Sequence, residues 1–183
     1  MTANLQRYHL RSAGSHDAQR LAVLALQVWL HTYAWSGVSD LIASYVLSEL
    51  TPAKFVGLLA DTKQHVIVAE HEDHLLGFAV INSASAYIGE EAVGDTGGNT
   101  KAIELATLYV QAHFIGQGVG RELIEAAQNW AREHDDSVLW LKVNAQNHHA
   151  KAFYSRLGYI KTASVDFMLG DQAYANDVML GCG

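Results

Sequence analysis

Residues 103–143 read IELATLYVQAHFIGQGVGRELIEAAQNWAREHDDSVLWLKV. The stretch opens on an apolar, β-branched run from Ile103 to Val110, and it closes on a nearly continuous apolar run from Val138 to Val143. Between these runs, Gly118 to His134 carries apolar residues at helical spacing. Strand, helix and strand in this order predict a right-handed parallel crossover whose second strand is buried on both faces. The predicted fold class is therefore α/β with a mixed sheet.

The segments outside this stretch alternate between helical and extended patterns, and no internal repeat occurs. The remaining predicted helices are Asp17–Tyr33, a helix from Ser39 or Asp40 to Thr51, Ala53–Leu59, and Asn147–Leu157 with Gly158 as its left-handed cap. The remaining predicted strands are Leu5–Leu10, a hairpin of His65–Ala69 and Leu75–Ile81, and two terminal strands, Tyr159–Leu169 and Asp177–Cys182. Between the hairpin and Ile103, Ser83–Lys101 is rich in glycine and small residues, which is typical of a mobile connection.

Length and composition restrict the class of protein. The chain has 183 residues, half of them apolar, which predicts a single domain over residues 1–183. It has neither an uncharged apolar run of about 18 residues nor a signal-peptide layout, so we expect a cytoplasmic protein. The formal charge of −7 argues against nucleic-acid binding and favours a cationic substrate. The single cysteine, Cys182, cannot form an internal disulfide.

The glycine-rich turn Gly116-Gln117-Gly118-Val119-Gly120 lies where a predicted strand gives way to an amphipathic helix. Glycines at a helix N-terminus allow successive backbone N–H groups to converge on a pyrophosphate, whose charge the helix dipole favours. The same spacing also fits a turn that binds nothing. A P-loop is excluded because no Lys followed by Ser or Thr is present, and the spacing of the three glycines does not match a Rossmann fingerprint.

A second motif follows in residues 141–159, which read LKVNAQNHHAKAFYSRLGY. It combines a buried strand, an Asn that starts a helix, an aromatic pair about two turns later, and a Gly followed by an aromatic residue where the helix ends. Together with Leu108-Tyr109-Val110 and the glycine turn, this pattern resembles the GNAT superfamily of acyl-coenzyme A N-acyltransferases. The resemblance implies a mostly antiparallel central sheet with a splayed parallel strand pair and flanking helices. It also implies acetyl-coenzyme A as co-substrate, with no metal.

The family's coenzyme contacts can be carried over to matching positions. In the family, backbone groups of the strand pair with the pantetheine arm, turn residues hold the pyrophosphate, and a tyrosine lies near the sulfur. The matching positions here are Leu108, Tyr109, Val110, Gly116, Gln117, Gly118, Val119, Gly120, Arg121, Asn147, Phe153 and Tyr154. The family usually has Arg or Gln where this chain has Ile115. Because backbone donors hold most of the pyrophosphate, we expect weakened rather than lost binding.

The proposed chemistry requires a base for the amine and an acid for the leaving thiolate. Glu104 is the candidate base, acting directly or through water, and its alternative reading is an exposed strand charge. Tyr154 is the candidate acid, and its alternative reading is core packing beside Phe153. The resemblance also suggests that the backbone N–H of Val110 polarises the thioester oxygen.

Residues for the acceptor amine are harder to choose. Tyr33, Trp35 and Tyr87 lie on or beside loops and could border an amine by cation–π contact, although packing is at least as good a reading. His71 and His74 fall in a two-strand turn without further ligands, so we assign no metal.

A finer resemblance points to the polyamine branch of the family, related to spermidine/spermine N-acetyltransferases. It rests on Glu104, on the run Trp140-Leu141-Lys142-Val143, and on the tail Phe167–Asp171 with Asn176–Met179. The predicted partner is a small-molecule amine, with neither nucleic acid nor membrane; a homodimer stays open. Two alternatives also stay open: acetylation of a protein N-terminus, a lysine or an aminoglycoside, and a coenzyme A-binding regulatory module without turnover.

Overall fold

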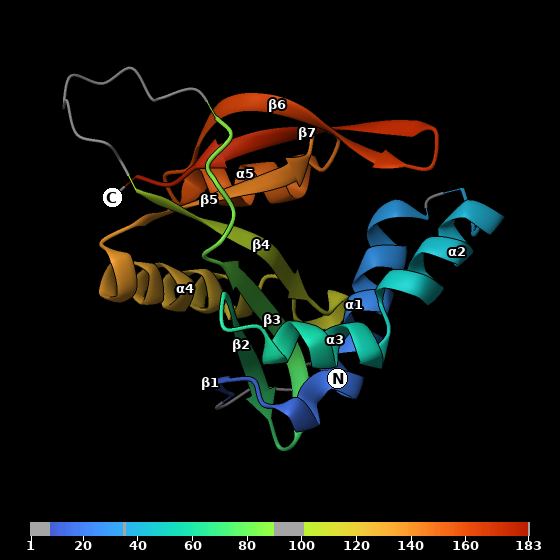
Figure 1. Ribbon diagram of the computed structural model, residues 1–183, viewed down its shortest axis with the longest axis horizontal. Helices are drawn as coiled ribbons and strands as arrows, with labels where there is room; N and C mark the ends of the chain where they lie inside the picture. The colour runs from blue at the N-terminus through green and yellow to red at the C-terminus, as the bar shows by residue number, and fades with distance from the viewer. Residues whose placement is uncertain (1–7, 35, 90–100, 183) are drawn as a thin grey trace. The chain divides into compact units, whose positions relative to one another are not determined.

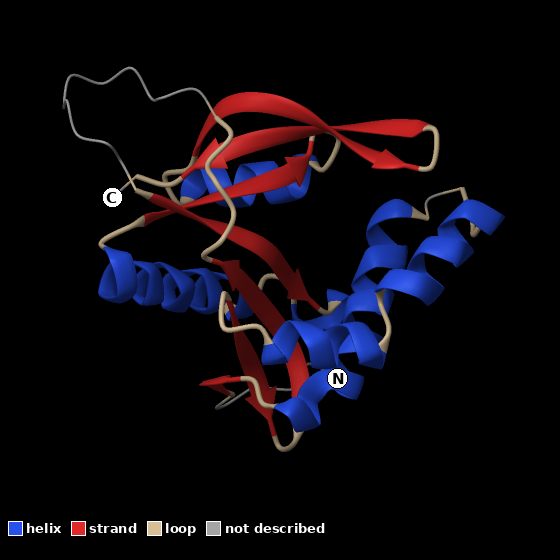
Figure 2. Ribbon diagram, viewed as in Figure 1, coloured by secondary structure: helices blue, strands red, loops and turns tan. Residues whose placement is uncertain are grey.

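The computed structural model describes residues 8–34, 36–89 and 101–182 (Figures 1 and 2). The chain begins with strand β1 and ends with the antiparallel hairpin of β6 and β7. The strands are β1 (His9–Ser12), β2 (Gln64–His71), β3 (His74–Asn82), β4 (Ala102–Val110), β5 (Val138–Asn144), β6 (Ile160–Leu169) and β7 (Gln172–Leu180). The helices are η1 (Ser15–Asp17), α1 (Ala18–Tyr33), α2 (Asp40–Glu49), α3 (Pro52–Ala60), η2 (Ala112–Phe114), α4 (Val119–Asp135) and α5 (His148–Arg156).

The seven strands are hydrogen-bonded in the order β1-β2-β3-β4-β5-β7-β6. The pairs β1–β2, β5–β7 and β6–β7 are antiparallel, whereas β4 and β5 are parallel. This confirms the mixed sheet with one parallel pair that the strand-helix-strand pattern predicts. The contacts divide the chain into two compact units, residues 1–80 with 107–126 and residues 81–106 with 127–183.

The predicted elements agree with the observed ones except at two strands. Strand β1 runs over His9–Ser12 rather than Leu5–Leu10, and residues 5–7 lie outside the described part of the chain. Strand β7 begins at Gln172, not at Asp177. The prediction started too late because none of the residues Gln172–Asn176 is buried, so the segment has no buried apolar face to mark a strand. Residues 90–100 of the predicted glycine-rich connection are also outside the described part.

The core of the first unit lies between two helices and the β2–β3 hairpin. Helix α1 contributes Leu21, Leu24 and Ala25, and α3 contributes Phe55. The hairpin turn consists of Glu72 and Asp73, both at positive φ of 45° and 65°, as a two-residue connection between twisted strands requires. The other buried members of this core are Ala18, Ala22, Val66, Val68, Leu75, Phe78 and Val80.

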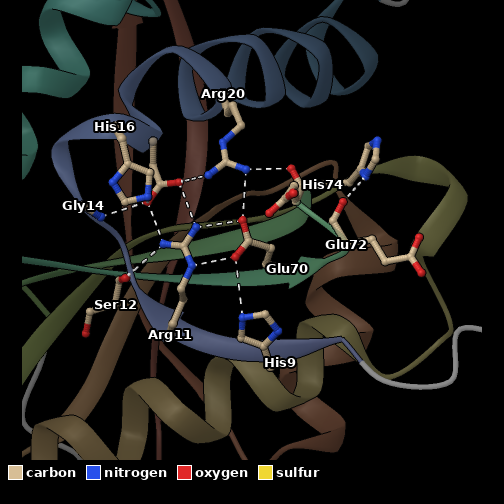
Figure 3. A network of polar contacts seen from close by, with 11 residues as sticks. His9, Arg11, Ser12, Gly14, His16, Arg20, Glu70, Glu72 and His74 are labelled. Atoms are coloured by element: carbon tan, nitrogen blue, oxygen red, sulfur yellow. Dashed lines mark hydrogen bonds and ion pairs between the residues drawn. The ribbon is translucent and has the colours of Figure 1, made fainter.

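A buried ionic network joins the start of α1 to β1 and β2 (Figure 3). Arg11 of β1 donates to both Glu70 oxygens, at 2.7 and 2.8 Å, and to both Asp17 oxygens, at 2.7 and 2.9 Å. Arg20 donates to Glu70 and to the Asp73 carbonyl oxygen. Asp17 is the N-cap residue of α1, but its carboxylate accepts from Arg11 and from the Gly14 N–H instead of from the helix. Two carboxylates and two guanidinium groups therefore neutralise each other in this unit.

The core of the second unit centres on Trp140 of β5 with Val178 and Leu180 of β7. Nine residues of strand β6 pair with β7, and the register shifts between Lys161 and Ala163, so Thr162 forms a bulge. Helix α5 runs alongside these strands (Figure 1).

Candidate active site

The glycine turn is exposed at Gly116–Gly118, and its last two residues, the buried Val119 and the half-buried Gly120, are the first two residues of α4. Gly116 and Gly118 have φ values of +81° and +92°, a region that side-chain-bearing residues rarely adopt. The first helical hydrogen bond of α4 runs from the Glu122 N–H to the Gly118 carbonyl oxygen, at 3.0 Å. The N–H groups of the residues between them precede the helical ladder and are available to an anion. The turn therefore has the geometry of an anion-binding helix start.

Two neighbours shape this turn within the first unit. A Cβ built on Gly118 would lie 3.7 Å from the hydroxyl oxygen of Tyr8, a residue that sequence reasoning did not single out. Burial, and to a smaller extent the neighbouring Glu122 carboxylate, raises the pKa of Tyr8 to about 12, so the hydroxyl stays protonated. On β3, Gly77 approaches β4 so closely that a Cβ would lie 2.6 Å from the Tyr109 carbonyl oxygen. Only glycine fits at position 77 beside the strand that leads to the turn.

The parallel ladder between β4 and β5 is short. It runs from Ala102↔Val138 to Glu104↔Trp140, whereas β4 continues to Val110 and β5 to Asn144. Parallel strands that stop pairing part-way leave backbone donors and acceptors without a ladder partner.

Glu104 lies at the last of these ladder pairs and is buried, being 5% exposed. Its Oε1 is 2.8 Å from Nζ of Lys142, which in turn lies 5.5 Å from the centre of the Trp140 ring. The alternative reading of Glu104 as an exposed strand charge is therefore wrong. Sequence reasoning missed Lys142, although it is the one charged residue in the otherwise apolar run Val138–Val143, and that was the signal.

Helix α5 carries the tyrosine assigned to the leaving thiolate. Asn147 caps the helix, because its Oδ1 accepts from the Ala150 N–H at 3.0 Å. Tyr154 is 8% exposed, and its ring lies 5.2 Å from that of Phe153 and 5.8 Å from that of Tyr159. The ring therefore packs among aromatic neighbours, which leaves the role of the hydroxyl to be tested.

Two of the three aromatic residues assigned to the acceptor, Tyr33 and Tyr87, lie in the described part of the chain. Tyr33 lies at the end of α1, where its ring contacts Trp29 at 4.7 Å, and burial raises its pKa. Tyr87 donates to Oγ1 of Thr162 at 2.8 Å and meets the Trp140 ring edge-on at 5.8 Å. Trp35 lies outside the described residues. Packing contacts thus account for the positions of the two that are described.

The model of the acetyltransferase (GNAT) family matches residues 29–159. The chain belongs to this family. This GNAT acetyltransferase is 25% identical over 164 residues to an uncharacterized N-acetyltransferase of Mycobacterium tuberculosis, covering 90% of this chain and 96% of the relative. It is 26% identical over 161 residues to the N-alpha-acetyltransferase RimI of the same organism, covering 87% and 82% of the two chains.

A solved structure shares the fold. The PaiA N-acetyltransferase from Thermoplasma acidophilum, crystallised in complex with coenzyme A, matches with a TM-score of 0.71 at 17% identity, covering 94% of this chain and 98% of that chain. Within residues 8–34, 36–89 and 101–182, no group of three or more His, Cys, Asp or Glu side chains could hold a metal ion. None of the described helices is long and apolar enough to cross a membrane.

Proposed function

We propose that this GNAT acetyltransferase transfers the acetyl group of acetyl-coenzyme A directly to a small amine, with a polyamine as the preferred class. The observation that carries the coenzyme part of the proposal is the turn Gly116–Gly120, with two glycines at positive φ before the free N–H groups of α4. The pyrophosphate would bind there. The pantetheine arm would pair with the backbone of Leu108–Val110 as an added strand.

The reaction needs one proton removed and one supplied. The neutral nitrogen of the acceptor attacks the thioester carbonyl, a C–N bond forms, and the C–S bond breaks. Glu104 takes the amine proton, directly or through water, and the Tyr154 hydroxyl gives its proton to the leaving thiolate. The ammonium of Lys142 lies 2.8 Å from Oε1 of Glu104 and forms an ion pair with this buried carboxylate.

Replacing Tyr154 tests the acid role. Tyr154→Phe keeps the ring that contacts Phe153 and Tyr159 and removes only the hydroxyl. We expect kcat to fall roughly ten- to a thousandfold, with little change in the affinity for acetyl-coenzyme A, as for loss of one general acid. Initial rates and calorimetric titration with coenzyme A separate the two quantities. Turnover equal to that of the parent would return Tyr154 to a packing role.

The polyamine assignment rests on the formal charge of −7 and on the resemblance of the tail. A second acceptor class, the α-amino group of a polypeptide, is favoured by the similarity to the N-alpha-acetyltransferase RimI. We would compare rates on spermidine, an aminoglycoside, a neutral amino-acid amide, a lysine peptide and a lysine-free peptide with a free N-terminus, at low and high salt. Spermidine should rank first, and salt should raise its apparent KM by screening. If the rate on spermidine is the lowest of the series, or does not change with salt, the polyamine assignment is refuted. If the rate on the lysine-free peptide is the highest, the acceptor is the α-amino group of a polypeptide.

A further inference from the structure

Asp177 is a buried carboxylate on β7 that the proposed reaction does not use. It is 2% exposed, and its two oxygens each lie 2.6 Å from a lysine Nζ, Oδ2 from Lys151 and Oδ1 from Lys161. Ser164 also donates to Oδ1, at 3.4 Å. The contact with the Lys151 ammonium, and then that with Lys161, hold the pKa of Asp177 below its ordinary value. The carboxylate is therefore an internal anion occupied by two lysines, and no longer available to a cationic substrate.

The two lysines come from different elements. Lys161 belongs to β6, where the bulge at Thr162 shifts the register. A one-residue shift moves a strand's side chains to the other face, so the bulge places Lys161 on the same face as Asp177. Lys151 belongs to α5, and its Nζ also donates to the Ala145 carbonyl oxygen at 3.2 Å, in the segment that joins β5 to the helix.

Helix α5 depends on such contacts for its orientation. It has only nine residues, and an isolated helix of that length is marginal in water. Its first turn is held by the Asn147 cap and by Lys151, while Tyr154 lies one turn further along the same helix. Lys151 and Tyr154 are three residues apart, so they lie on neighbouring positions of one helix face.

We propose that Asp177, acting through Lys151, is a positioning residue that fixes the rotation of α5 and so presents the Tyr154 hydroxyl for proton transfer. The inference rests on the acid role proposed for Tyr154. It explains why a carboxylate that the proposed reaction does not use lies buried on β7 in contact with the helix that carries the acid. Lys161 shares the same carboxylate but lies on β6, so it supplies a matched control.

The test uses Lys151→Met and Lys161→Met, each in the parent and in the Tyr154→Phe background. In the parent, Lys151→Met should lower kcat about tenfold while KM for acetyl-coenzyme A changes less than about threefold, because a misplaced acid affects the chemical step. Lys161→Met should lower kcat less than about threefold. In the Tyr154→Phe background, Lys151→Met should lower kcat less than about twofold, since the group that it positions is already gone.

Lys151→Arg restores the positive charge and should recover most of the turnover lost in Lys151→Met. Thermal unfolding of every variant, with Asp177→Asn as a second way to break the contact, separates misplacement from loss of fold. The inference is overturned if Lys151→Met lowers kcat equally in both backgrounds, or if Lys161→Met lowers kcat as much as Lys151→Met. Failure of the underlying acid role is seen separately, as full turnover of the single variant Tyr154→Phe, and it would remove the inference as well.

Discussion

Replacing Gly118 probes the coenzyme site most directly, because its backbone conformation sets the cost of any side chain. At φ +92°, an Ala would carry a strain of about 1–2 kcal/mol, and its Cβ would meet only the Tyr8 hydroxyl oxygen at an ordinary 3.7 Å. The strain, not a clash, is therefore the perturbation. If coenzyme A requires the native turn, binding must restore that φ, and affinity should fall roughly five- to thirtyfold.

A series at this position separates strain from charge. Gly118→Asn should lose less affinity than Gly118→Ala, since Asn visits positive φ more readily. Gly118→Glu has the same strain as Ala and adds a negative charge at the start of α4, so binding should fall below detection. Gly116→Ala, at φ +81° with no heavy atom within 4 Å of its Cβ, should resemble Gly118→Ala if both glycines shape the turn.

Isothermal titration with coenzyme A measures these affinities, and circular dichroism confirms that each variant is folded. Gly57→Ala is the matched control, because it adds the same methyl group at a glycine inside α3. It should leave coenzyme A affinity unchanged. Parental affinity in Gly118→Glu would refute the assignment of the pyrophosphate to this turn.

Two further predictions concern stability. Gly57→Ala should raise the free energy of unfolding by about 0.5–1 kcal/mol, because the added Cβ meets nothing within 4 Å and Ala favours a helix. Urea denaturation measures this free energy, and a loss of stability would contradict the prediction. In the buried network of Figure 3, hydrogen bonds from Arg11 lower the pKa of Glu70 to about 2 from an ordinary 4.5. The ionised Glu70 carboxylate therefore stabilises the folded protein above pH 4.5, and this contribution is lost as pH falls towards 2. At about 1.36 kcal/mol per pKa unit, the loss is about 3 kcal/mol. Glu70→Gln should flatten the dependence of urea midpoints on pH in that range, whereas Glu49→Gln, in an exposed pair with Lys54, should not; an unchanged slope in Glu70→Gln would contradict the assignment.

The sequence by itself determined the elements whose patterns are local. The alternation of apolar residues, the Asn147 cap and the glycine after α5 predicted α4, β5 and α5 within one or two residues, because helix caps and buried strands depend on neighbouring residues. The glycine turn was also readable from sequence, since positive φ at Gly116 and Gly118 is a property of glycine itself.

Only the tertiary structure decided which side chains meet. The pairing of Glu104 with Lys142 depends on the parallel register of β4 and β5, and residues 38 positions apart in sequence carry no local sign of it. The start of β7 at Gln172 depends on pairing with β6, because none of its first five residues is buried. The contact of Asp177 with Lys151 and Lys161 depends on a bulge and on where α5 lies, and both are set by packing between segments rather than by the residues within any one of them.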